Sequence, residues 1–102
     1  MAFFFVRLLP LRPDFPTGMT PEEAATMKAH SGFLAEQLAR GTLVVAGPVL
    51  APSGAFGMGV FECASVEEAR ELLAHDPATG LGTYEIAPMA AATARPRSTR
   101  AR

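Results

Sequence analysis

The chain has 102 residues, 49% of them hydrophobic, and a formal net charge of −1. This length predicts one small domain, and the charge excludes a strongly basic nucleic-acid-binding protein. Its single cysteine, Cys63, excludes an internal disulfide, and no apolar run approaches the roughly 18 residues of a membrane-spanning helix.

The chain opens with a dense apolar run, Ala2 to Leu9, which is rich in phenylalanine and ends at Pro10. Its length and the prolines that follow favour a strand over a helix. The run lacks the basic region of a signal peptide, so we expect no secretion signal and a cytoplasmic protein. Residues 11–19 contain prolines and a glycine, which are typical of a loop.

A long helix is predicted to follow this loop. Thr20 provides the N-cap, Pro21 takes the first helical position, and Glu23 completes a capping box. Gly41 ends the helix. Residues at helical spacing predict its buried face: Ala24, Met27, Ser31, Leu34 and Leu38. His30 lies at the edge of this face, where an imidazole can be half-buried and still reach a pocket.

Two strands, a second helix and a last strand complete the chain. After the first helix we expect a strand, a turn-rich connection and a second strand, at Thr42–Gly47, Pro48–Gly54 and Ala55–Cys63. The second helix begins with another capping box, formed by Ser65 and Glu68. Pro77 cannot continue a helix, so this one ends near Asp76. Thr83–Ala87 is the last predicted strand.

The predicted order β-α-β-β-α-β is typical of an α+β, ferredoxin-like fold, with two helices on one face of a four-stranded antiparallel sheet. A strand with one wet face should alternate apolar and polar residues. The first strand instead has Phe3 and Phe5 on one side, and Phe4, Val6 and Leu8 on the other. Because two short helices cannot cover both faces, we expect a homodimer through the open sheet face.

Charge divides the chain into two parts. Residues 1–94 form the predicted domain and contain all ten acidic residues but only five lysines and arginines. Residues 95–102 contain the other four arginines and are interpreted as a flexible, solvated tail. Four charges without aromatic residues make a weak nucleic-acid footprint, so we expect neither nucleic acid nor membrane as a partner.

Six short motifs run in order through residues 2–89. They are His30 within MKAHSGFLAEQLARG, then AGP at 46–48, GMGVFE at 57–62, SVEEAR at 65–70, DP at 76–77 and YEIAPM at 84–89. In this order they resemble the YCII-related (YciI-like) family, whose members are small ferredoxin-like domains that dimerise as α/β barrels. Residues 12–20 look like the longer first loop of one bacterial subgroup, and residues 78–83 are shorter than the family pattern.

The resemblance implies a candidate active site and a class of chemistry. In the family, the histidine of the first helix and the aspartate of the DP motif are the proposed active-site pair, which here are His30 and Asp76. The resemblance further implies cofactor-independent acid/base chemistry, such as isomerisation, elimination or related lyase chemistry, on a small organic molecule. No zinc-binding spacing and no phosphate-binding GxGxxG loop occur, so we expect neither metal nor cofactor.

Each member of the pair also has a structural interpretation. The alternative for His30 is a structural histidine whose ring is hydrogen-bonded within the fold, and Asp76 before Pro77 is typical of a turn. If the two side chains meet, Asp76 would orient the imidazole and stabilise its charged form, as in general acid–base catalysis. His75 is predicted to lie at the surface.

Four further residues are candidates for substrate binding. Gly47 and Pro48 would shape the pocket floor through their backbone. Tyr84 would either offer its hydroxyl to the pocket or pack in the dimer. Arg7 lies among apolar residues and would hold an anionic substrate or pair with an acid.

Three functions therefore stand at this point. The chain is an enzyme that uses a His–Asp pair, or a non-catalytic small-molecule-binding or accessory module with the same pocket, or a structural dimer whose arginine tail is an interaction arm. The first two predict a small-molecule ligand, and only the first predicts turnover that depends on His30.

Overall fold

A computed structural model describes residues 1–95 of the chain. The elements follow the predicted order, with one short 3-10 helix (η1) added before the last strand. They are β1 (Ala2–Pro10), α1 (Pro21–Arg40), β2 (Leu43–Ala51), β3 (Gly54–Cys63), α2 (Val66–Ala74), η1 (Pro77–Leu81) and β4 (Gly82–Met89). The basic tail predicted at 95–102 lies outside the described residues, apart from Arg95.

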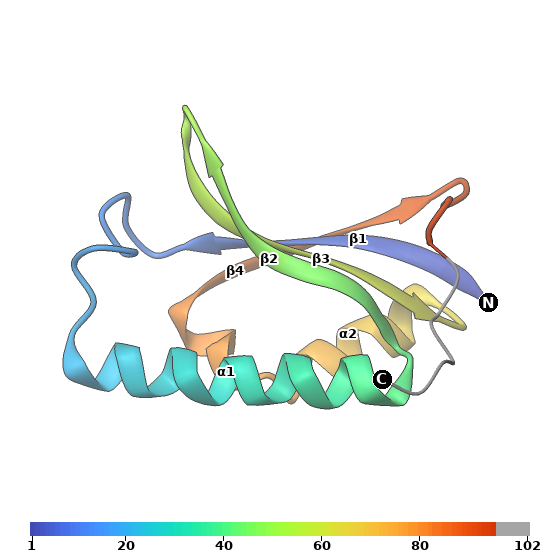
Figure 1. The fold of residues 1–102 in the computed structure, drawn as a ribbon, viewed down its shortest axis with the longest axis horizontal. Coiled ribbons are helices and arrows are strands. Elements are labelled where there is room, and N and C mark those ends of the chain that lie inside the picture. Colours follow the sequence, from blue (N-terminus) through green and yellow to red (C-terminus); the bar gives the residue numbers. More distant parts are fainter. Residues whose placement is uncertain (96–102) are drawn as a thin grey trace.

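The four strands form one antiparallel sheet in the order β2-β3-β1-β4. Both helices lie against one face of this sheet and leave the other face open (Figure 1). This arrangement confirms the ferredoxin-like α+β fold. Within residues 1–95, neither helix combines the length and the apolar character that a membrane crossing requires.

Helix α1 begins and ends where the sequence predicts. The Thr20 hydroxyl accepts a hydrogen bond from the Glu23 N–H at 3.1 Å, and the Glu23 carboxylate accepts one from the Thr20 N–H at 2.9 Å. Gly41 has a φ of 83°, in the left-handed region that glycine adopts without steric cost. These two ends fix which residues of α1 face the sheet.

The predicted buried face of α1 is only partly right. Ala24 is exposed and Leu38 is 50% exposed, while the fully buried residue is Gln37. The other predicted residues line a cavity between the helix and the sheet: Met27, Ser31 and Leu34. The reason is that α1 packs mainly against β2 and η1, which leaves a space over the middle of the sheet.

Strands β2 and β4 are longer than predicted. Pro48 was expected to begin a turn, but it lies within β2, and only Pro52 and Ser53 form the turn before β3. A proline is tolerated here because β2 is an edge strand, which does not need every N–H for pairing. The last strand likewise runs beyond the predicted Thr83–Ala87 at both ends.

Helix α2 begins at the predicted cap, with one change in the capping contacts. The Ser65 hydroxyl accepts from the Glu68 N–H at 3.1 Å, but the Glu68 carboxylate accepts from the Ala64 N–H rather than from that of Ser65. The helix ends at Ala74, and the exposed His75 follows as its C-cap. Pro77 then opens η1 instead of an irregular loop.

The passage from η1 into β4 requires a glycine. A Cβ atom placed on Gly82 would lie 2.2 Å from the Leu9 carbonyl oxygen and 3.0 Å from the Leu8 side chain. The first residue of β4 therefore approaches β1 more closely than any side chain permits. Because Gly82 directly follows η1, this close contact fixes the position of η1 and of its N-cap, Asp76, relative to β1.

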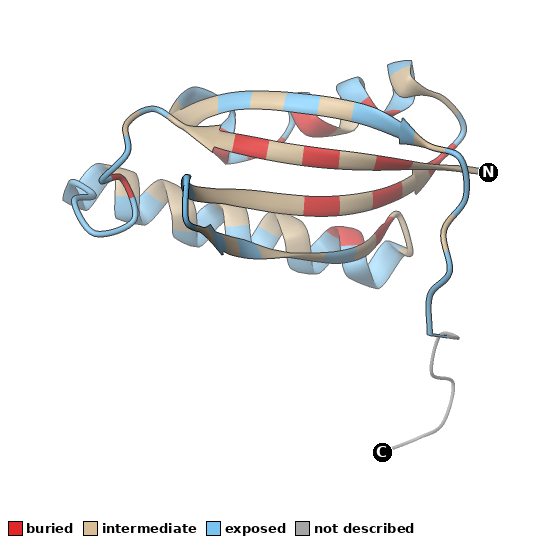
Figure 2. Ribbon diagram, turned by 90° about the horizontal axis from the view of Figure 1, so that it is seen from above, coloured by how far each residue is buried: buried red, intermediate tan, exposed pale blue. Residues whose placement is uncertain are grey.

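The hydrophobic core lies between the sheet and the helices. The larger cluster of buried side chains contains Val6, Leu43, Phe61 and Leu73, and a smaller one contains Phe4, Cys63 and Ala69. Burial alternates along β1, where Phe4, Val6 and Leu8 are buried and their neighbours are half-buried (Figure 2). The side chains on one face of the sheet are thus buried beneath the helices, and the other face carries apolar side chains that this chain leaves partly uncovered.

Candidate active site

His30 and Asp76 lie in contact, although 46 positions separate them in the sequence. His30 lies in the middle of α1, and Asp76 occupies the turn between α2 and η1. The His30 Nδ1 atom is 2.8 Å from both carboxylate oxygens of Asp76. His75, the neighbour of Asp76, is exposed, as predicted.

The Asp76 carboxylate is enclosed and accepts hydrogen bonds from three sides. Its side chain is 1% exposed. Besides His30, the Tyr84 hydroxyl donates to one oxygen and the Ala78 N–H donates to the other at 2.9 Å. Burial alone would raise the pKa of Asp76, but the hydrogen bonds from His30, Tyr84 and Ala78 outweigh it and hold this pKa below its usual value. Asp76 is therefore a carboxylate at neutral pH.

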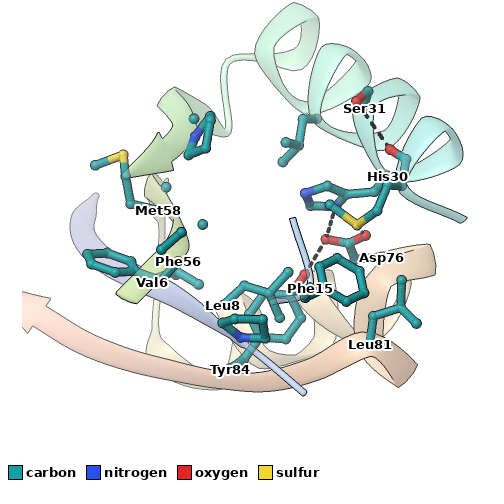
Figure 3. Close-up of a pocket in the computed structure, with 18 of the residues that line it drawn as sticks. Val6, Leu8, Phe15, His30, Ser31, Phe56, Met58, Asp76, Leu81 and Tyr84 are labelled. Carbon is teal, nitrogen blue, oxygen red and sulfur yellow. Dashed lines mark hydrogen bonds and ion pairs between the residues drawn. The ribbon is translucent and has the colours of Figure 1, made fainter. Parts of the chain in front are cut away.

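This charge determines how the His30 ring is used. A carboxylate only accepts hydrogen bonds, so Nδ1 of His30 must carry the proton in the contact. In the neutral ring, Nε2 is then unprotonated and free to accept a proton. Figure 3 shows this second nitrogen directed into the cavity, away from Asp76. The pair thus presents a base to the cavity and keeps its counter-charge buried.

Tyr84 is part of the same group of side chains. It lies on β4, where it is paired with Leu8 of β1, and its hydroxyl donates to Asp76 rather than pointing into open space. Burial, and then the contact with Asp76, raise the pKa of the Tyr84 hydroxyl well above its usual value. Tyr84 therefore remains a neutral donor that fixes the orientation of the carboxylate.

A cavity of about 380 Å³ opens beside this group. Its lining is predominantly apolar and comes from both central strands, from α1 and from the loop before it. The lining residues with polar side chains are His30, Ser31, Asp76 and Tyr84. No lysine or arginine of the described chain lines it, so the cavity has no fixed positive charge for an anionic ligand.

The other predicted binding residues fall into two groups. Gly47 and Pro48 of β2 line the cavity. Arg7 does not line it, because it lies on the open face of the sheet. There its guanidinium donates to the Glu85 carboxylate and lies 5.4 Å from the centre of the Phe56 ring. The ion pair with an acid, one of the two alternatives for Arg7, is thus present.

The loop between β1 and α1 also contributes to the cavity, which the sequence did not predict. Phe15, Pro16 and Met19 of this loop line the cavity, and Phe15 is only 6% exposed. The available signal was a large aromatic residue between prolines, since a buried ring is unusual in an otherwise polar loop. Within residues 1–95, no three His, Cys, Asp or Glu side chains lie close enough together to hold a metal ion.

Comparisons with known proteins place this geometry in context. A family model, the YCII-related domain, matches residues 3–91, whereas no curated protein sequence matches the chain. One similar solved structure is the 5-chloro-2-hydroxyhydroquinone dehydrochlorinase of Burkholderia phenoliruptrix in complex with 2,5-dihydroxybenzoquinone, at 18% identity over 83% of this chain and 90% of that one, with a TM-score of 0.64. A mutant cofactor-independent oxygenase from Streptomyces nogalater is 18% identical over 94% of this chain and 97% of that one, with a TM-score of 0.47.

Proposed function

The chain belongs to the YCII-related domain family, and we propose that it is a cofactor-independent enzyme that transfers a proton on a small organic molecule. In this proposal His30 is the general base and acid, and Asp76 orients it and stabilises its charged form. The reaction class is isomerisation, elimination or related lyase chemistry.

One observation carries the proposal. His30 donates from Nδ1 to a buried carboxylate and turns Nε2 toward a mainly apolar cavity. A histidine that served packing alone would not need an acidic partner whose charge is maintained by two further hydrogen bonds. The arrangement supports a base whose protonated form is stabilised where it forms.

The proposed step balances without any other reagent. Nε2 of His30 takes a proton from a carbon of the substrate, and the electron pair of that C–H bond forms a new double bond. In an elimination, the leaving group departs with the electron pair of its bond to the neighbouring carbon, and Nε2 then gives its proton to that group. In an isomerisation, the electron pair of an adjacent double bond moves to the far atom of that bond, and Nε2 returns the proton there. Asp76 remains ionised throughout and faces the imidazolium that forms.

The remaining candidate residues have narrower roles in this proposal. Tyr84 acts through Asp76, so we assign it to positioning rather than to direct substrate contact. Gly47 and Pro48 form part of the cavity lining that a substrate would contact. Arg7 is left without a role in binding, because its partner is Glu85 on the far face of the sheet.

We also propose that the protein works as a homodimer through the open sheet face. Side chains there are apolar and only half-buried within one chain: Phe3, Phe5, Phe56, Met58 and Val60. A contiguous apolar surface of this kind is uncommon on a monomer and is typical of an interface. A second copy of the same sheet would cover it with matching chemistry.

Turnover in heavy water tests the catalytic proposal. The wild-type protein is incubated with 2-tetralone, whose C–H bonds beside the carbonyl are acidic, and deuterium uptake is followed by mass spectrometry. A parallel assay uses 5-chloro-2-hydroxyhydroquinone and follows chloride release. We expect His30→Ala to lower the rate that wild type shows by about 100- to 10,000-fold, and His75→Ala to leave it unchanged. An unaltered rate in a folded His30→Ala protein would refute the catalytic role.

The binding-module alternative makes a different prediction for the same protein. Its supporting observation is that Asp76 also caps η1 through the Ala78 N–H, a purely structural task. If the pocket only binds, 2-tetralone or 5-chloro-2-hydroxyhydroquinone should raise the Tm and be recovered unchanged after long incubation. Product or deuterium exchange that disappears with His30 decides for the enzyme.

A further inference from the structure

The loop between β1 and α1 forms a wall of the cavity. Phe15 projects from this loop into the space that also contains His30 (Figure 3). Loop side chains usually face water, yet Phe15 is 6% exposed. Backbone hydrogen bonds within the loop shape it, from the Phe15 N–H to the Arg12 carbonyl at 3.1 Å and from the Gly18 N–H to the Asp14 carbonyl at 2.8 Å.

Arg12 connects this wall to the start of helix α1. Its two terminal nitrogens donate to the two carboxylate oxygens of Glu23 at 3.0 and 2.7 Å, and one of them also donates to the Gly18 carbonyl at 2.6 Å. The Arg12 guanidinium lies 5.4 Å from the centre of the Phe15 ring. A bidentate ion pair of this kind fixes the orientation of the guanidinium as well as its distance from the carboxylate. The loop is therefore connected to a rigid helix.

Glu23 is well suited to be this anchor. Its carboxylate is already part of the α1 capping box, where it accepts from the Thr20 N–H. The hydrogen bonds from Arg12 and then from Thr20 lower the pKa of Glu23 to about 2. Glu23 is therefore a charged carboxylate at neutral pH.

The lining of the cavity defines the ligand that this wall would meet. Of its four polar side chains, Asp76 and Tyr84 are committed to each other, and Nε2 of His30 is the ring nitrogen left for a ligand. With no lysine or arginine in the lining, an anionic ligand would lose its hydration without a fixed counter-charge. A neutral, largely apolar ring with one proton-bearing group fits this surface.

We propose that Phe15 determines the size of the neutral aromatic ligand that the pocket accepts, and that Arg12 is the positioning residue that holds Phe15 in place. The inference deepens the proposed function, since the ligand's proton-bearing group would face His30. Ligand size selection is nevertheless separate from turnover, because it depends on the wall and not on proton transfer.

Binding of two fluorescent ring compounds tests the role of Phe15. The probes are 2-naphthol and the larger 9-phenanthrol, and the measured quantity is the ratio of their Kd values. We expect wild type to favour 2-naphthol, and Phe15→Ala to weaken 2-naphthol about tenfold while bringing the ratio toward or past unity. Phe15→Trp keeps an aromatic side chain in the wall but makes it larger. It should therefore exclude 9-phenanthrol more strongly than wild type does. Leu11→Ala is the control, because this 60% exposed residue of the same loop does not line the cavity.

Arg12→Gln tests the positioning role. We expect it to shift the Kd ratio in the same direction as Phe15→Ala, with a smaller change, and Glu23→Gln to do the same. Arg7→Gln is the matched control, since Arg7 also contacts a carboxylate and an aromatic ring but lies outside the cavity. A Kd ratio in Arg12→Gln equal to that of wild type would overturn the assignment of Arg12.

Three results would overturn the inference as a whole. One is a ratio in Phe15→Ala and Phe15→Trp that equals the ratio in Leu11→Ala. Another is tighter binding of 2-naphthoate than of 2-naphthol, and the third is the absence of binding of either neutral probe. His30→Ala separates this inference from the catalytic proposal. If exchange survives in His30→Ala while Phe15 variants still change the ratio, the catalytic proposal fails and the role of Phe15 stands.

Discussion

The two faces of the sheet come from the same strands but do different work. On the covered face, Val6 and Phe61 are 2% exposed, and the cavity with His30 opens beside them. On the open face, Phe5 and Val60 lie opposite each other in the β1–β3 register and remain half-buried. One set of apolar residues therefore stabilises the single chain and lines the site, whereas the other is the surface at which we propose that a second copy binds.

The largest expected effect comes from the covered face. Phe61→Ala removes a ring from the larger core cluster, so we expect the free energy of unfolding to fall by about 3–5 kcal/mol. Urea denaturation at a fixed protein concentration measures this loss. A loss no greater than that of a half-buried phenylalanine on the other face would break the distinction between the two faces.

The buried carboxylate gives the next largest effect, and it depends on pH. Asp76 has a lowered pKa in the folded state, so its stabilisation is fully present above the unfolded pKa of about 3.9 and is lost as the pH falls through the folded value. Asp76→Asn should cost about 2–4 kcal/mol at pH 7 and flatten the decline in acid. Thermal unfolding measured from pH 7 down to acid tests both the loss at pH 7 and the flatter decline. If the stability of wild type and of Asp76→Asn fell in parallel as the pH is lowered, the stabilising role of the Asp76 carboxylate would be contradicted.

The open face should show a small effect on folding and a large one on assembly. Phe5→Ser should lower the stability of an isolated chain by about 1–2 kcal/mol, which is less than the loss in the Phe61 variant. It should also convert the proposed dimer into monomers. Sedimentation velocity of both proteins over a concentration series measures the assembly. Leu50→Ser, at an 83% exposed position near the end of β2, is the control that should remain dimeric. A monomeric wild type would remove the proposed role of this face.

The smallest effect separates the two arginine–glutamate pairs. Arg7 and Glu85 on the open face have side chains that are 41% and 50% exposed, so a double-mutant cycle should give about 0.2–1 kcal/mol. Arg12 and Glu23 are less exposed and make a two-pronged contact, and their coupling should be larger and less sensitive to salt. Equal couplings for the two pairs would show that both are ordinary surface pairs.

The ends of helix α1 are predicted well from the sequence, because a single residue type performs each capping function. The cap at Thr20, its reciprocal contact with Glu23 and the stop at Gly41 are all confirmed. The end of β2 is predicted wrongly at Pro48, because a proline usually indicates the end of a strand, whereas an edge strand such as β2 tolerates one. Helix periodicity also misleads at Ala24 and Leu38, which are exposed and do not line the cavity, since periodicity identifies an apolar stripe without telling how much of it neighbouring elements cover.

The candidate site divides in the same way. The contact between His30 and Asp76 was expected from the family resemblance and is present in the structure, while its catalytic role stays a prediction. The hydrogen bond from Tyr84 to Asp76 and the burial of Phe15 depend on the register of β4 and the path of a loop. Neither is encoded in a local pattern, because each arises only when distant segments pack together.

The proposed function depends on one property of the site, namely that Asp76 holds His30 with Nδ1 protonated and Nε2 open to the cavity. Nitrogen NMR of the histidine side chains measures this directly, with the exposed His75 as an internal reference. We expect the neutral ring of His30 to be the Nδ1–H tautomer, and Asp76→Asn to weaken that preference. A neutral His30 ring that carries its proton on Nε2 in the wild-type protein would contradict the proposed role of Asp76 in orienting His30.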